Sequence, residues 1–95
     1  MSKFDSYKKE FLKVLNIVSR DEKLLDEFLQ DLLTPNERKI LFLRWQIVKR
    51  LAKKEPQRDI AEELNVGIAT ITRGAREMRN PKGGFKLALK KLNLV

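Results

Sequence analysis

The chain is 95 residues long and carries 21 Lys and Arg residues against 13 Asp and Glu, a formal net charge of +8. It has no cysteine and no histidine, which excludes disulfides, Cys/His zinc sites, thiolate nucleophiles and imidazole bases. We therefore expect no enzyme and no metal or cofactor site. No apolar run approaches the roughly 20 residues of a membrane span, and the N-terminus lacks the apolar core of a signal peptide, so we expect a cytoplasmic protein with no membrane contact.

The size and the charge distribution also predict partners. Without a Pro- or Gly-rich linker, residues 1–95 should form a single domain. A domain this small buries little more than about 60% of its unfolded surface, so a second copy would add core, and we expect a homodimer. Residues 1–33 hold six Lys and Arg against seven Asp and Glu, net −1, whereas residues 34–95 hold fifteen against six, net +9. The basic second half indicates a polyanionic partner, chiefly phosphates.

Two amphipathic helices are predicted first. From Phe4 to Val18 apolar residues recur at spacings of three and four, which places a single apolar stripe along a helix. Asp21 is positioned to cap a second helix, Glu22–Leu32, whose apolar face is rich in leucine. The first stripe could pack on a partner subunit as easily as on its own chain.

A long helix should follow. Thr34 as N-cap, Pro35 at the first helical position and Glu37 at the third form a capping box. The helix should extend to about residue 53 or 54 and end before Pro56, whose ring cannot follow a helical residue. Its apolar arc is wide, which is typical of a central helix. We assign residues 1–55 to the dimerisation core.

Arg44 is an unusual residue in that apolar arc. A lone cation among apolar neighbours is costly unless some group meets it. The alternative is that its long side chain extends past the apolar surface into solvent.

Residues 57–79 have the pattern of a helix-turn-helix. They read QRDIAEEL, then NVG, then IATITRGAREMR, two short amphipathic segments separated by a three-residue break. Gly67 can take a positive φ, and Asn65 is the other residue in the break that tolerates one. Small polar and basic side chains on the second segment suit a helix that enters a DNA groove. After a turn at residues 80–84, a C-terminal packing helix is expected within residues 84–95, from Phe85 to about residue 92.

From Leu33 to Met78 the chain resembles the Trp repressor family. Three segments carry the resemblance in register: LTPNER, LRWQIVKRL and QRDIAEELNVGIATITRG. ATITRG at residues 69–74 is the most specific part, because ordinary helix-turn-helix domains usually have a bulky apolar residue where this chain has Gly74. The missing side chain is expected to leave a hole behind the reading helix.

The resemblance implies an all-α fold, a six-helix intertwined homodimer with a helix-turn-helix head that reads DNA. It implies a transcriptional repressor whose affinity for double-stranded operator DNA is raised by an aromatic amino acid, L-tryptophan, bound between core and head. Arg44 and Arg73 stand where two arginines of the family flank the indole, Thr34 and Arg73 would hold the carboxylate, and Gly74 would leave room for the ring. Glu77 replaces a serine common near the ligand's amino group, where a carboxylate could pair with an ammonium or disfavour the ligand's carboxylate.

The expected DNA face follows from the same head. Its residues are Gln57, Arg58, Ile68, Ala69, Thr72 and Arg76. For Ile68 and Thr72 the alternative is a packing or capping role, because β-branched residues pack well. Two other functions stay open: a ligand-independent or sigma-factor-like helix-turn-helix DNA binder, and a basic helical module that binds other proteins.

Overall fold

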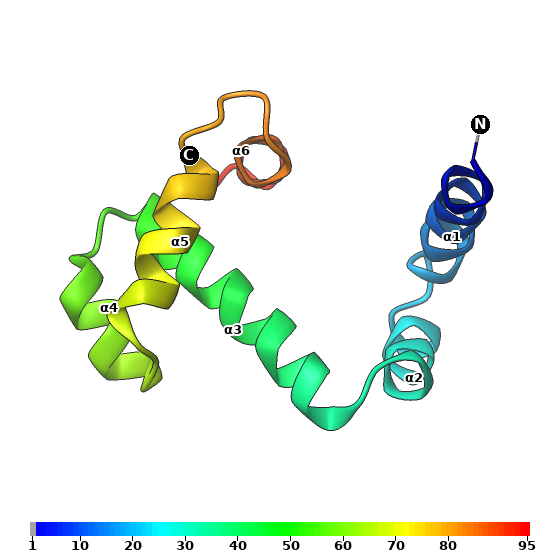
Figure 1. Ribbon diagram of the computed structural model, residues 1–95, viewed down its shortest axis with the longest axis horizontal. Helices are drawn as coiled ribbons and strands as arrows, with labels where there is room; N and C mark the ends of the chain where they lie inside the picture. Colours follow the sequence, from blue (N-terminus) through cyan, green and yellow to red (C-terminus); the bar gives the residue numbers. More distant parts are fainter. Residues whose placement is uncertain (1) are drawn as a thin grey trace. The chain divides into compact units, whose positions relative to one another are not determined.

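The computed structural model describes residues 2–95 and confirms the all-helical prediction. Within that range it has six helices and no strand: α1 Lys3–Val18, α2 Glu22–Leu32, α3 Pro35–Ala52, α4 Gln57–Leu64, α5 Ile68–Met78 and α6 Gly84–Lys91 (Figure 1). The chain divides into two compact units that meet within α3, one ending at Arg38 and the other comprising Lys39–Val95. The homodimer stays a prediction. The assignment of residues 1–55 to dimerisation, 57–79 to a helix-turn-helix and 84–95 to packing also stays a prediction.

Local capping chemistry sets where the helices of the first unit begin. The carboxylate of Asp21 accepts hydrogen bonds from the backbone N–H groups of Lys23 and Leu24, at 3.1 and 3.3 Å, which confirms the predicted cap of α2. Ser2 and Asp5 form a capping box at the start of α1 that the sequence analysis did not identify. These side chains satisfy N–H groups that have no partner inside the helix.

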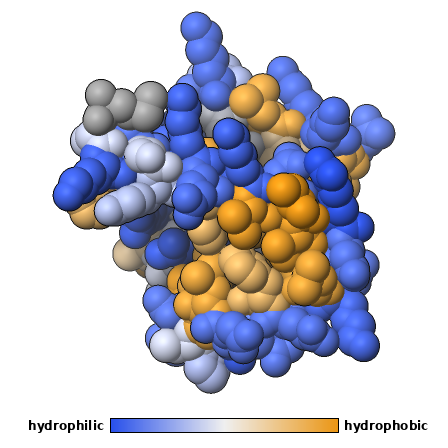
Figure 2. Space-filling view, turned by 90° about the vertical axis from the view of Figure 1, so that its right-hand side faces the viewer, coloured by the Kyte–Doolittle hydropathy of each residue, from blue (hydrophilic) through white to orange (hydrophobic). Residues whose placement is uncertain are grey.

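The first unit has very little interior. Helices α1 and α2 pack on each other, with the rings of Phe11 and Phe28 6.4 Å apart, yet no residue from 2 to 38 is buried. Phe4 and Tyr7 are 81% and 60% exposed. On the side that carries α1 and α2, Figure 2 shows apolar side chains gathered in an uncovered area. The apolar stripe predicted for α1 therefore exists but has no cover in one chain.

The second unit holds the core. Helices α4 and α5 pack closely against each other, and α6 contacts α5. The buried cluster comprises Ile47 of α3, Ile60 and Ala61 of α4 and Ile71 of α5. Leu51, Leu64 and Val66 pack around this cluster. Because the cluster joins three helices, it fixes the helix-turn-helix on the second half of α3.

The break of the helix-turn-helix is a turn made by one of the two residues expected to tolerate a positive φ. Asn65 is the residue in the left-handed region, with φ 54° and ψ 49°, and its N–H bonds to carbonyl groups of the last turn of α4. Gly67 has an ordinary φ of −68° and is the N-cap of α5. The predicted turn is therefore confirmed, and of the two residues expected to tolerate a positive φ it is Asn65 that adopts one.

Candidate functional site

The exposed face of α5 carries most of the predicted DNA-binding residues. Ile68, Thr72 and Arg76 follow one another at four-residue spacing, and all three are exposed, so they lie in one stripe along the helix. Ile68 is 52% exposed, which argues against a core role for this residue. The hydroxyl of Thr72 lies 3.1 Å from the carbonyl oxygen of Ile68 and 3.2 Å from Oε1 of Gln57. Local hydrogen bonding thus orients Thr72 and places Gln57 beside α5.

The remaining predicted DNA residues occupy different surroundings. Arg58 is exposed on α4 and lines a shallow surface pocket together with Ile68, the first residue of α5. Ala69 is also exposed, but it lines the cavity described below, on the neighbouring face of α5. Their contacts with DNA stay predictions.

A cavity of about 800 Å³ lies behind α5. Its walls come from α3, from the turn before α5, from α5 itself and from α6. They are formed by Ile40, Leu43, Arg44, Ile47, Val48, Val66, Ala69, Thr70, Arg73, Gly74, Glu77 and Phe85. Most of these side chains are apolar. The polar side chains are few, the hydroxyl of Thr70 and the charged groups of Arg44, Arg73 and Glu77. A mainly apolar lining with a few polar groups is the usual make-up of a site for a small molecule.

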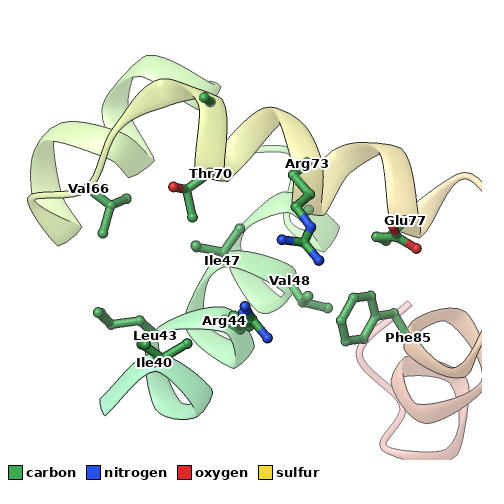
Figure 3. A pocket seen from close by; sticks show the side chains of 12 residues that line it. Ile40, Leu43, Arg44, Ile47, Val48, Val66, Thr70, Arg73, Glu77 and Phe85 are labelled. Atoms are coloured by element: carbon green, nitrogen blue, oxygen red, sulfur yellow. The ribbon is translucent and has the colours of Figure 1, made fainter. Parts of the chain in front are cut away.

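Two guanidinium groups reach this cavity from opposite helices. Figure 3 shows Arg73 extending from α5 toward α3, with Arg44 on the facing side of α3. Both side chains belong to exposed residues, and among residues 2–95 the only ion pairs are those of Arg50. The two arginines therefore remain available to an anion or to an aromatic ring. For Arg44 this accounts for a cation in the apolar arc.

Gly74 lines the cavity, but not for the reason expected. A Cβ at this position would come within 3.0 Å of Cγ2 of Ile47 and 3.6 Å of Cδ1 of Leu51. Side chains of α3 thus fill the space that a side chain at residue 74 would take. The predicted hole at this residue is therefore wrong. The glycine lets α5 approach α3 closely, and the cavity lies beside this contact.

Glu77 and Phe85 complete the far part of the cavity. Glu77 lies one turn after Arg73 on α5, and Phe85 begins α6 (Figure 3). Phe85 was predicted only as a packing residue, because its position depends on how the turn at residues 80–84 returns the chain to α5. The shortness of that turn was the only feature of the sequence that could have indicated that Phe85 lies close to α5.

Thr34 belongs to the first unit, at the start of α3. Its backbone N–H donates to Oε1 of Glu37 at 2.8 Å, and its Oγ1 accepts from the N–H of Glu37 at 3.2 Å, which confirms the capping box. The hydrogen bond from the backbone of Thr34, followed by that of its side chain, lowers the pKa of Glu37. A contact of Thr34 with a ligand stays a prediction.

An ionic contact that the sequence analysis missed joins α3 to α4. Nη1 of Arg50 lies 2.6 Å from Oε2 of Glu63 and 3.6 Å from Oε1 of Glu55. The hydrogen bond to Glu63 is the main reason that the pKa of Arg50 is raised. The Nε of Arg50 is buried and has no hydrogen-bond partner. The ion pair between Arg50 and Glu63, called the ionic clasp below, links α4 of the helix-turn-helix to the end of α3.

Residues 2–95 include no cluster of acidic residues that could hold a metal ion. None of their helices is both long and apolar enough to cross a membrane.

An exposed polar and basic helix, set by a left-handed turn against its partner helix, defines a helix-turn-helix DNA-binding regulator. The family model described as Trp repressor protein matches residues 7–93, and the chain belongs to this family of transcription regulators, which are not enzymes.

Individual relatives agree with the family match. The chain is 43% identical over 83 residues to the Trp operon repressor homolog of Mannheimia succiniciproducens, covering 86% of this chain and 81% of the relative. It is 42% identical over 87 residues to that of Haemophilus influenzae, covering 90% and 85%. It is 40% identical over 86 residues to that of Vibrio cholerae, covering 87% and 84%.

Proposed function

We propose that this chain is a homodimeric repressor that binds operator DNA through α4 and α5, and that L-tryptophan in the cavity raises its affinity for the operator. Family membership supports the regulatory role. The observation that carries the ligand-dependent part is the cavity behind the reading helix, with Arg44 and Arg73 on its two sides. A repressor acts where the DNA is, so the proposed location is the cytoplasm.

The chemistry of the cavity supports an aromatic amino acid. Guanidinium groups are planar, stack on aromatic rings and bind carboxylates with two parallel hydrogen bonds. Apolar side chains such as Ile47, Val48 and Phe85 supply the surface for an indole. The proposed arrangement places the indole between Arg44 and Arg73 and lets Arg73 also hold the carboxylate.

Coupling between ligand and DNA follows from where the cavity lies. Its walls belong to α3 on one side and to α5 on the other, so an occupant touches both the support of the head and the reading helix. A ligand that binds better to the DNA-competent placement of α5 must raise DNA affinity by the same factor by which DNA raises ligand affinity. Couplings of this kind are typically about 5- to 150-fold.

The uncovered apolar surface supports the homodimer. Within residues 2–95, the six buried hydrophobic residues all lie at or after Ile47. In contrast, eight of the exposed large hydrophobic residues lie in α1 and α2, and Ile40, Leu41 and Phe42 add three more at the start of α3. Apolar area of this extent normally marks a protein interface. In a chain this small, covering it with a second copy would also supply the missing core.

The test starts from DNA sequences selected by the full-length protein from a random duplex pool in the presence of L-tryptophan. Affinity for a selected duplex is then measured by fluorescence anisotropy at two salt concentrations, with and without L-tryptophan. We expect L-tryptophan to raise affinity about tenfold or more, and we expect Arg44→Ala to abolish this gain while leaving the affinity without ligand nearly unchanged. Equal affinity with and without L-tryptophan would refute the ligand-dependent function and favour a ligand-independent DNA binder. Binding that is indifferent to sequence would refute the repressor itself.

A further inference from the structure

The carboxylate of Glu77 lines the cavity but forms no ion pair with the arginines that line it, Arg44 and Arg73. Arg73 and Glu77 are four residues apart on α5, so their side chains share one face of the helix and normally lie within reach of each other. Both line the cavity, yet they form no ion pair in residues 2–95. Arginine preceding glutamate is also the weaker order for such a helical pair. The cavity therefore presents separate positive and negative groups.

The charges are placed in sequence along the cavity. Figure 3 shows Arg73 and Arg44 near its middle, and Glu77 one turn further along α5, next to Phe85. A ligand carboxylate on Arg73 would have its neighbouring substituent close to the Glu77 end. In an amino acid that substituent is an ammonium, which is attached to the same carbon as the carboxylate. A zwitterion thus matches the two charges of α5 in the order in which the helix presents them.

We propose that Glu77 makes the ammonium group of the ligand a requirement, so that the cavity accepts aromatic amino acids and rejects the corresponding acids without an amino group. The proposal rests on the proposed function, because it takes the aromatic ligand to bind in this cavity. Without the ammonium, the carboxylates of ligand and Glu77 face each other with no cation between them, and like charges repel. With the ammonium, the same position forms a charge-assisted hydrogen bond.

The expected discrimination is large enough to measure. Hydrogen bonds between charged groups in proteins change affinity by roughly 10- to 100-fold. Glu77 is exposed in the single chain, so solvent screens part of this effect. We expect the loss of the ammonium to weaken binding about tenfold, at the lower end of that range.

Isothermal titration calorimetry of the full-length protein without DNA tests this with three compounds: L-tryptophan, indole-3-propionate, which lacks the amino group, and tryptamine, which lacks the carboxylate. For the unmodified protein, L-tryptophan should bind about tenfold more tightly than indole-3-propionate. Glu77→Gln, which keeps shape and removes charge, should weaken L-tryptophan and strengthen indole-3-propionate, so that the preference disappears. Glu77→Asp should retain part of it. Tryptamine should lose affinity in Glu77→Gln.

Glu62→Gln is the matched control, because Glu62 is an exposed carboxylate on α4 that does not line this cavity. It should leave all three affinities unchanged. If the unmodified protein binds indole-3-propionate as tightly as L-tryptophan, and Glu77→Gln changes neither, the inference is refuted while the proposed function stands. If none of the three compounds binds, both are refuted. Circular dichroism of each variant checks that its helices are retained, and Glu77→Asp decides the matter should the glutamine variant fail to fold.

Discussion

Replacing Gly74 by alanine tests whether α5 depends on close contact with α3. The new Cβ would lie 3.0 Å from Cγ2 of Ile47, about 0.5 to 1 Å closer than the optimal separation of two carbon atoms. Ile47 is only 2% exposed and belongs to the buried cluster with Ile60 and Ile71, so moving it away from the new methyl group would disturb its packing in that cluster. The substitution therefore places a methyl group where the side chains of Ile47 and Leu51 already lie.

Two opposing effects determine the size of the change. Overpacking a filled core costs about 1 to 3 kcal/mol, whereas alanine is more favourable than glycine inside a helix by up to about 1 kcal/mol. The difference predicts that Gly74→Ala destabilises each chain by about 1 kcal/mol. For a domain of this size, that lowers the melting temperature by roughly 4 to 8 °C.

Urea unfolding measures the change in the free energy of unfolding. Each variant is measured at equal chain concentration, because the stability of a dimer depends on concentration. Gly84→Ala is the control. It lies at the first position of α6, where an added Cβ meets nothing within 4 Å, so it should be neutral or stabilising by up to about 1 kcal/mol. If Gly74→Ala were as stabilising as Gly84→Ala, the close packing of α5 on α3 would be wrong.

Three further substitutions test the capping box, the ionic clasp and the reading helix. In the folded chain the pKa of Glu37 is depressed by Thr34, so its stabilising effect is present above the ordinary pKa of about 4.5 and is lost as the pH falls through the folded value. Thermal unfolding should show Glu37→Gln less stable than the unmodified protein at pH 7 and equal to it at pH 2; a gap that persists at pH 2 contradicts the cap. Arg50→Met should lower the melting temperature by removing the ion pair with Glu63, and part of this loss should disappear in 1 M salt; an unchanged loss would assign it to packing alone. Arg76→Ala should weaken operator binding and reduce the salt slope by about 1, and unchanged affinity at two salt concentrations removes Arg76 from the DNA face.

Helix positions could be predicted from the sequence because short-range chemistry determines them. The caps at Asp21 and Thr34 connect groups at most three residues apart, and Pro56 separates α3 from α4 regardless of tertiary structure. The same locality predicted the turn after α4 and two residues, Asn65 and Gly67, that could take a positive φ; the structure shows that Asn65 does. Both types suit a turn, and only the backbone geometry distinguishes them.

Long-range contacts were less predictable for the same physical reason. Gly74 suggested a hole because its neighbours across the helix interface are absent from the local sequence; in the structure Ile47 and Leu51 fill that space from α3. Arg50 meets Glu63 across thirteen positions, and no periodicity indicates such a pair. Phe85 reaches the cavity only because α6 returns to α5. Arg44 was the exception, since a cation in an apolar arc is already unusual in the sequence.

The correction at Gly74 changes how a ligand could control the reading helix. If the absent side chain had left a hole, the ligand would fill a defect under α5 and its removal would leave the helix unsupported. Instead α5 rests directly on Ile47 at this glycine, and the cavity lies beside that contact, between Arg44 and Arg73. A contact point with a charged cavity next to it would allow α5 to tilt about Gly74 without leaving the core. A ligand that brings the two guanidinium groups onto one aromatic ring would then set the tilt of α5 about Gly74. It would not decide whether α5 packs on α3 at all.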